Sequence, residues 1–302
     1  MRKYMPQDMI GKFCLVTGAN SGIGKEISLG LLKLGAHVTM LCRNAARGKA
    51  VMEDIRQRSA NKSVDLIVAD LASQKQIRAA AQEYLDKYDK LHILVNNAGI
   101  VMDNRVLTED GMEMTFAVNY LAYFMLTNLL TGVIERSAPA RVINMTSMAH
   151  KTVKLDFENL QGEKRYSRDT SYAQSKLADI MFTYEFARRM HGTGVSVNCV
   201  CPGAVYSTLW EDSSKLVNGF FKLFMKGPEE GARLPLYLAC SPEVDGLSCR
   251  YFQTGQHLKF QKVSTRRTAA RSSSETYDKA LADKLWQVSE KLTGLHGVGR
   301  SV

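Results

Sequence analysis

Tyr172 and Lys176 lie in the segment "TSYAQSKLADIM", and their types and spacing could support proton transfer. On a helix, side chains at i and i+4 share one face, one turn apart. A free tyrosine has a pKa of about 10, too high for a base at neutral pH, but a nearby cation lowers that value. Such a tyrosine could give a proton to a carbonyl oxygen or take one from an alcohol. On spacing alone, the commoner interpretation is a tyrosine packed on a lysine stem.

A larger fold must position this pair, and the chain alternates two kinds of segment. Short apolar, β-branched runs recur, with longer segments of helical periodicity between them. The runs are "FCLVTG", "HVTMLC", "VDLIVADL", "LHILVNNAG", "RVINMTS" and "VSVNCVCPG". This alternation predicts an α/β fold, a doubly wound parallel sheet with right-handed crossovers. Ligands bind such a sheet at the carboxyl ends of its strands, so the residues after each run are the candidates for a site.

A glycine-rich turn follows the first run, in "TGANSGIGKE". Gly18, Gly22 and Gly24 let the backbone turn sharply and approach a pyrophosphate, and the next helix supplies free N–H groups and a positive dipole end. The spacing is GxxxGxG, not the GxGxxG of most dehydrogenase domains. Such a turn can be purely structural, but its place directly after the first strand indicates dinucleotide binding.

Arg43 directly follows the second run, where an acidic side chain would hydrogen-bond the ribose 2′-hydroxyl of NAD. No acid stands at this position. The planar guanidinium can instead pair with a 2′-phosphate and stack on the adenine. We therefore predict NADP(H) as the cofactor; the alternative is that Arg43 only solvates the end of a strand.

Taken in order, these motifs resemble those of the short-chain dehydrogenase/reductase family. The matching positions are Thr17 to Gly24, Asp70-Leu71, Asn96-Asn97-Ala98-Gly99, Asn119, Ser147, Tyr172-x-x-x-Lys176 and Pro202-Gly203. Four segments are similar to the retinol dehydrogenase branch: "CRNAARG", "SAPARVINMTSMAH", "EKRYSRDTSYAQSKLA" and "LADKLWQVSEKLTGL". The resemblance runs from about residue 10 to residue 296 and implies a single doubly wound Rossmann-type domain, with a parallel sheet of about seven strands flanked by helices.

The resemblance also implies catalytic roles. Tyr172 would be the acid and base, and Ser147, at the end of the fifth strand, would hold the substrate oxygen by a hydrogen bond. Lys176 would lower the pKa of Tyr172 and hold the nicotinamide ribose. Asn119 would anchor a water that completes a proton relay from Lys176.

Further residues are implied as cofactor contacts. Asp70 and Leu71 would flank the adenine, although Asp70 could be only a strand-end cap. The family often has Thr five residues after the proline of Pro202-Gly203, whereas this chain has Ser207 followed by Thr208. The full set of expected cofactor contacts is Gly18, Asn20, Ser21, Gly22, Ile23, Gly24, Arg43, Asp70, Leu71, Asn97, Ala98, Gly99, Tyr172, Lys176, Pro202, Gly203 and Ser207.

The segment "LWEDSSKLVNGFFKLFMKGPEEGA", residues 209–232, covers the substrate in the enzymes that this chain resembles. Its aromatic and aliphatic residues suit a long apolar molecule, and residues 209–226 could also rest on a membrane. The alternative is a helix packed on its own core or on a second copy in a homo-oligomer. We expect residues 11–254 to form the catalytic core with a lid at about 206–232, and 255–302 to form a partly mobile extension that ends in a helix.

Three functions fit these observations. The first is an NADP(H)-dependent oxidoreductase that interconverts an apolar aldehyde or ketone and its alcohol, foremost retinaldehyde and retinol or a lipid aldehyde. The second is a reductase of steroids, quinones or other carbonyls. The third is a weakly catalytic NADP-binding scaffold that acts through partners, and the presence of Asn119, Ser147, Tyr172 and Lys176 argues against it.

Composition excludes other classes. The net charge of +10 is spread along the chain without an aromatic-interleaved basic patch, so we expect no nucleic-acid partner. No long apolar window and no apolar signal core occur, and six scattered cysteines are typical of reduced thiols. We expect an intracellular protein, cytoplasmic or peripherally bound to the endoplasmic reticulum membrane, without a transmembrane segment or metal. His150 is expected to be a solvated loop residue.

Overall fold

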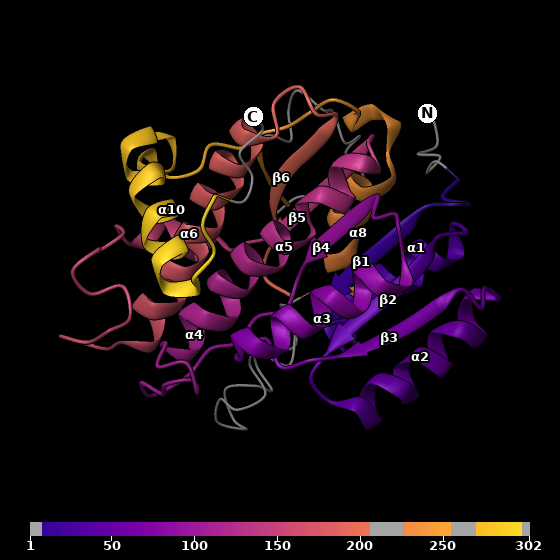
Figure 1. Ribbon diagram of the computed structural model, residues 1–302, viewed down its shortest axis with the longest axis horizontal. Coiled ribbons are helices and arrows are strands. Elements are labelled where there is room, and N and C mark those ends of the chain that lie inside the picture. The colour runs from indigo at the N-terminus through magenta and orange to yellow at the C-terminus, as the bar shows by residue number, and fades with distance from the viewer. Residues whose placement is uncertain (1–7, 206–225, 255–269, 298–302) are drawn as a thin grey trace.

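The computed structural model describes residues 8–205, 226–254 and 270–297 (Figure 1). Its strands form one seven-stranded sheet in the order β3-β2-β1-β4-β5-β6-β7, and every neighbouring pair is parallel. This confirms the predicted doubly wound α/β fold. The strands are β1 (Phe13–Thr17), β2 (His37–Cys42), β3 (Val64–Val68), β4 (Ile93–Asn96), β5 (Ala140–Met145), β6 (Val195–Cys201) and β7 (Arg250–Gln253).

The strand sequences are apolar because the central strands are covered on both faces. Every residue of β4 and of β6 is buried, and a strand buried on both sides reads as a continuous apolar run. The chain winds outward in one direction through β1, β2 and β3 and then returns to place β4 on the other side of β1. This reversal is the topological switch point, where open α/β sheets bind ligands.

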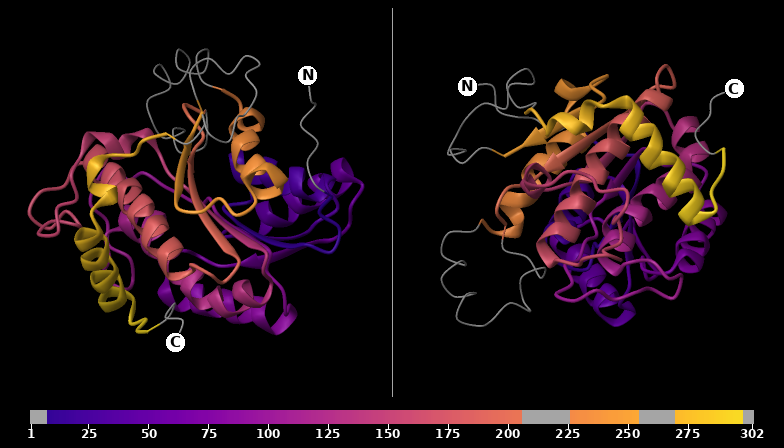
Figure 2. Two further views of the ribbon diagram at one scale, coloured as in Figure 1. Left: turned by 90° about the horizontal axis from the view of Figure 1, so that it is seen from above. Right: turned by 90° about the vertical axis from the view of Figure 1, so that its left-hand side faces the viewer.

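Helices cover the two faces of the sheet. One face carries α1 (Gly22–Lys33), α2 (Ala45–Ser59) and α8 (Pro228–Cys240), and the other carries α3 (Gln74–Lys87), α5 (Ala122–Arg136) and α6 (Arg168–Arg189). The left view of Figure 2 shows α8 and α6 on opposite sides of the strands. Each face buries its own apolar cluster, so the sheet is the middle layer of three.

Short helical turns lie between the longer elements. They are α4 (Met114–Phe116), the π-helical stretch η1 (Ala117–Leu121), and the 3-10 turns η2 (Met148–Thr152), η4 (Pro242–Val244) and η5 (Ser274–Tyr277). From α4 through α5 the chain runs as one helix, Met114–Arg136, which by length and composition could cross a membrane. Of its most apolar stretch, 89% is buried within the protein, as expected of a core helix. No other helix in the described ranges meets that test.

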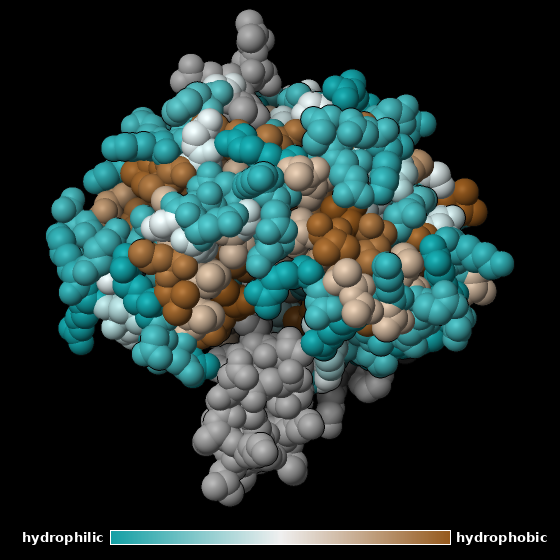
Figure 3. Space-filling view, turned by 60° about the horizontal axis from the view of Figure 1, so that its bottom comes forward, coloured by the Kyte–Doolittle hydropathy of each residue, from teal (hydrophilic) through white to brown (hydrophobic). Residues whose placement is uncertain are grey.

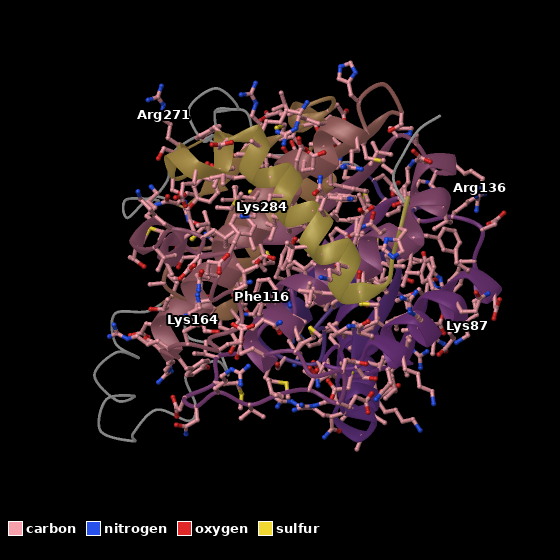
Figure 4. All side chains as sticks on the ribbon, turned by 60° about the vertical axis from the view of Figure 1, so that its left-hand side comes forward. Lys87, Phe116, Arg136, Lys164, Arg271 and Lys284 are labelled. Carbon is pink, nitrogen blue, oxygen red and sulfur yellow. The ribbon has the colours of Figure 1, made fainter. Side chains whose placement is uncertain are left out.

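The last described helix, α10 (Lys279–Thr293), packs across α6. Its Trp286 is buried, stacks on Phe182 with ring centroids 6.0 Å apart, and meets the edge of Phe124 at 4.9 Å. The Arg189 guanidinium lies 3.7 Å from the Trp286 ring centroid. Figure 4 shows α10, marked by Lys284, lying over α6. These contacts extend the apolar core beyond the sheet and fix α6, the helix that carries Tyr172 and Lys176.

Candidate active site

A cleft of about 400 Å³ opens at the carboxyl ends of the central strands. This volume falls within the usual range of small-molecule sites. The cleft brings together residues that are up to 184 positions apart in the chain, from Gly18 to Pro202. The predicted site residues that line it are Gly18, Asn20, Ser21, Gly22, Ile23, Arg43, Asp70, Leu71, Asn97, Ala98, Gly99, Tyr172, Lys176 and Pro202.

The glycine-rich turn needs its glycines for conformation and for space. Gly18 and Gly22 have φ values of +65° and +52°, in the left-handed region that side chains disfavour. A Cβ at Gly24 would clash with the Gly18 carbonyl oxygen and lie 2.5 Å from Asn97 Nδ2. The third glycine therefore lets the first turn of α1 pack against the loop after β4.

The N-terminus of α1 fits an anionic group. Ser21 caps the helix without a side-chain hydrogen bond, and the first turn contains no acidic residue. The positive end of the helix dipole is therefore not neutralised by the chain itself and faces the cleft that Ser21, Gly22 and Ile23 line. A dinucleotide pyrophosphate would satisfy these N–H groups.

Thr17, buried at the end of β1, ties the two central strands together. Its hydroxyl accepts hydrogen bonds from the backbone N–H groups of Asn97 at 2.8 Å and of Ala98 at 3.0 Å. The side chain of Asn97 donates to the Thr17 carbonyl at 2.9 Å. Asn97 therefore holds the ends of β1 and β4 together at the cleft.

Arg43 stands at the rim of the cleft and is 74% exposed. Its Nη1 lies 3.7 Å from Asp70 Oδ2, while Asp70 Oδ1 accepts from the Ala72 N–H at 3.0 Å. Asp70 thus lines the cleft and also caps the end of β3 by this hydrogen bond. A second arginine, Arg47 in the first turn of α2, also lines the cleft. Arg43 lies before α2, so no helical spacing relates the two arginines.

Helix α6 places Tyr172 and Lys176 in the same cleft, one turn apart. Lys176 is only 4% exposed, and its Nζ donates to the Met145 carbonyl at 3.1 Å and to Asp179 Oδ2 at 2.8 Å. The ammonium also lies 5.3 Å from the ring centroid of Tyr123. The Lys176 ammonium is therefore held by polar partners and an aromatic ring at the cleft that Tyr172 also lines.

The pKa of Tyr172 lies above its ordinary value. Burial raises it most, while the Lys176 ammonium and a hydrogen bond with Ser147 lower it. Lys176 acts in the predicted direction, but its effect is smaller than that of burial. The direction predicted for Lys176 is confirmed, while the net rise comes from the enclosure of the phenol, which the sequence does not reveal.

Ser147 and Asn119 adjoin the cleft without appearing in its lining. Ser147 caps η2, and its Oγ accepts a hydrogen bond from the Ala149 N–H at 3.3 Å. Asn119 lies in the π-helical stretch, fully buried, and its side chain bonds the Ile100 backbone at 2.8 and 3.0 Å and Ser175 Oγ at 3.0 Å. Its amide thus joins the loop after β4 to α6.

His150 is wrongly predicted as a solvated loop residue. It is fully buried, its Nδ1 lies 2.6 Å from the Ser147 carbonyl, and its ring meets the edge of Tyr251 at 5.1 Å. Burial lowers the pKa of His150. Because Met148–Thr152 form a 3-10 turn, residue 150 folds back under Ser147, which a loop assignment from sequence misses.

The remaining expected contacts lie after β6. Pro202 lines the cleft, and Gly203, with φ of +85°, turns the chain beside it. Ser207 and most of the expected lid lie outside the described residues. Val205 and Lys226, which flank that range, pair in a parallel bridge. Cleft residues that sequence reasoning did not identify are Leu41, Cys42, Asn44, Arg47, Ala69, Ile100, Val118, Met145 and Thr146.

Comparison with known proteins agrees with this geometry. Residues 12–217 match the short chain dehydrogenase family. The chain belongs to this family. It is 42% identical to human retinol dehydrogenase 12, over 94% of this chain and 87% of that protein, and 40% identical to human retinol dehydrogenase 14, over 96% and 88%. The predicted likeness to the retinol dehydrogenase branch is confirmed, and the protein is an oxidoreductase of the short-chain dehydrogenase family.

Solved structures share the fold. An uncharacterised protein from Mycobacterium paratuberculosis superposes with a TM-score of 0.75 at 28% identity, covering 96% of both chains. RhlG of Pseudomonas aeruginosa superposes with a TM-score of 0.68 at 27% identity, covering 82% of this chain and 97% of that one. Among the described residues, no group of three His, Cys, Asp or Glu side chains is arranged to hold a metal ion.

We predict that Gly24→Ala destabilises the protein. The added methyl meets the Gly18 backbone and Asn97, neither of which can move freely, so we expect a loss of about 1 to 3 kcal/mol despite the better helix propensity of alanine. Chemical denaturation would measure it. The control is Gly132→Ala in α5, where the nearest group is the flexible end of Arg136 and alanine should stabilise. Equal effects of the two substitutions would contradict the packing described for the turn.

Proposed function

We propose that the protein is an NADP(H)-dependent oxidoreductase that interconverts an apolar aldehyde or ketone and its alcohol. The observation that carries the proposal is the convergence of the Tyr172 phenol and the buried Lys176 ammonium on the cleft that the glycine-rich turn opens. Retinaldehyde and retinol, or a lipid aldehyde, are the foremost substrates, since the relatives at about 40% identity are named retinol dehydrogenases.

The choice of NADP(H) rests on charge at the cleft rim. Arg43 and Arg47 line the part of the cleft that follows β2, where a ribose 2′-phosphate would lie. Asp70 is the acidic side chain of that rim, and Arg43 partly offsets it. RhlG of Pseudomonas aeruginosa, at 27% identity, is known as a complex with NADP. These points favour the phosphorylated cofactor.

The cofactor would lie along the cleft, with its pyrophosphate at the N-terminus of α1. Leu71, Asn97, Ala98 and Gly99 would border the adenosine part, and Lys176 would hold the nicotinamide ribose beside Pro202, Gly203 and Ser207. When bound, the nicotinamide supplies the hydride. The residues of the protein orient the reactants and transfer the proton.

Proton transfer is assigned to Tyr172. Its hydroxyl donates a proton to the carbonyl oxygen during reduction and takes one from the alcohol during oxidation. Lys176 favours the phenolate electrostatically, and Ser147 holds the substrate oxygen as charge develops on it. Asn119 fixes the backbone of Ile100 and the side chain of Ser175 through its own amide, so the relay water that the resemblance implies would be held by its backbone carbonyl.

An apolar substrate fits the surroundings of these groups. Ile100, Val118 and Met145 line the cleft, and Met148, next to Ser147, is 43% exposed although it is apolar. Figure 3 shows apolar side chains gathered in patches of an otherwise largely hydrophilic face. A lid at 206–232, and contact of 209–226 with a membrane or a second copy, remain part of the proposal and fall largely outside the described residues.

We predict that Tyr172→Phe lowers kcat by roughly 10² to 10⁴-fold, because the proton donor is lost. The affinity for NADPH, followed by the change in cofactor fluorescence, should stay nearly the same. The matched control is Tyr277→Phe, since Tyr277 is an exposed tyrosine outside the cleft. Turnover that survives Tyr172→Phe would rule out the assigned acid.

We predict that Arg43→Ala raises the KM for NADPH roughly tenfold or more, since a hydrogen bond to a charged group contributes about 1.5 to 3 kcal/mol. The KM for NADH should change little. Arg136→Ala, an exposed arginine at the end of α5 (Figure 4), is the control for loss of a surface charge. If Arg43→Ala raises both KM values equally, the 2′-phosphate assignment fails.

A further inference from the structure

Asp179 is a fully buried carboxylate directly behind the proposed active site. It lies one turn after Lys176 on α6, and its Oδ2 accepts a hydrogen bond from the Lys176 ammonium at 2.8 Å. Its other oxygen, Oδ1, is buried without a hydrogen-bond partner. A carboxylate that only completed the packing of α6 would be expected to have both oxygens satisfied, since an unmet buried acceptor is costly.

The groups that face Asp179 come from four elements. Tyr172 and Lys176 belong to α6, Tyr123 to α5, Tyr120 to η1, and Cys199 to β6. Burial raises the pKa of all three tyrosines and of the Cys199 thiol, so these groups are neutral near pH 7. Among the described residues, Lys176 is the charged group that acts on Asp179.

We propose that Asp179 is a positioning residue that acts on the reaction through Lys176. Its carboxylate fixes the ammonium by the 2.8 Å ion pair, and its negative charge opposes the effect of that ammonium on the Tyr172 phenol. The inference rests on the proposed function, in which Tyr172 transfers the proton. It adds a residue that tunes the acid without touching substrate or cofactor.

The charges act on Tyr172 with opposite signs. The Lys176 ammonium lowers the pKa of Tyr172, and the Asp179 carboxylate raises it. Burial raises the pKa of Asp179 itself to about 7, against the opposing effect of Lys176. Asp179 therefore changes its charge near neutral pH: below that point Lys176 acts on Tyr172 unopposed, and above it the carboxylate partly cancels the ammonium.

The test uses the full chain with the substitution Asp179→Asn, which keeps the shape of the side chain and an oxygen for Lys176. The first readout is the pH dependence of kcat/KM for alcohol oxidation with NADP⁺, in which the rising limb reports ionisation of Tyr172. We expect this limb to move to lower pH by about one pH unit, the size of effect that a neighbouring charge exerts. Asp179→Glu, which keeps the charge, should leave the limb close to that of the wild type.

The second readout needs neither cofactor nor substrate. An ultraviolet difference titration between the wild type and Tyr172→Phe follows the phenolate of Tyr172 alone, and the same difference taken in the Asp179→Asn background should titrate at lower pH. The proposal would be overturned if, in Asp179→Asn, the rising limb of kcat/KM and the titration of Tyr172 stay at the wild-type pH or move to higher pH.

If Asp179→Asn does not fold, the test uses Asp179→Glu, whose longer side chain moves the ion pair. We then expect kcat to fall while the rising limb of kcat/KM stays at the same pH. An unchanged kcat would overturn the positioning role. If Tyr172→Phe keeps its turnover, the proposed function fails instead, and the ultraviolet titration still reports whether Asp179 acts on Tyr172.

Discussion

The buried ammonium of Lys176 is the interaction on which the rest of the site depends. Removing a cation from water costs several kcal/mol unless charge and hydrogen bonds replace the water. Here the replacements come from three elements: the Met145 carbonyl at the end of β5, the Asp179 carboxylate on α6 and the ring of Tyr123 on α5. These partners can meet only if β5, α5 and α6 keep their relative positions. The structure holds them by a hydrogen bond from Thr146 to the Lys176 carbonyl and by the amide of Asn119.

A second set of contacts fixes the other half of the cleft. Thr17 joins the ends of β1 and β4, and Gly24 lets α1 approach that junction closely. The N-terminus of α1 is left without side-chain caps or acidic residues, which gives up local stability and leaves its N–H groups available to an anion. The fold therefore places a site for negative charge and a site for proton transfer on the same edge of the sheet.

Sequence reasoning identifies the features that depend on local pattern. The apolar runs specify the strands, and the places where they end specify which residues reach the cleft, among them Arg43, Asp70 and Pro202. Features that depend on packing escape it. The raised pKa of Tyr172 follows from enclosure, and the burial of His150 follows from a 3-10 turn. The side chain of Asn119 bonds a loop 19 residues away and a helix residue 56 residues away in the chain. None of these has a signal in spacing or composition.

The most direct test of the account is the initial rate of NADPH oxidation with all-trans-retinaldehyde, measured beside medium-chain aldehydes, steroid ketones and quinones, with NADH as the cofactor control. The account predicts turnover of retinaldehyde or another long apolar aldehyde, with NADPH preferred over NADH. Absence of turnover with every carbonyl, from protein that binds NADPH, would contradict the catalytic assignment and favour a cofactor-binding scaffold.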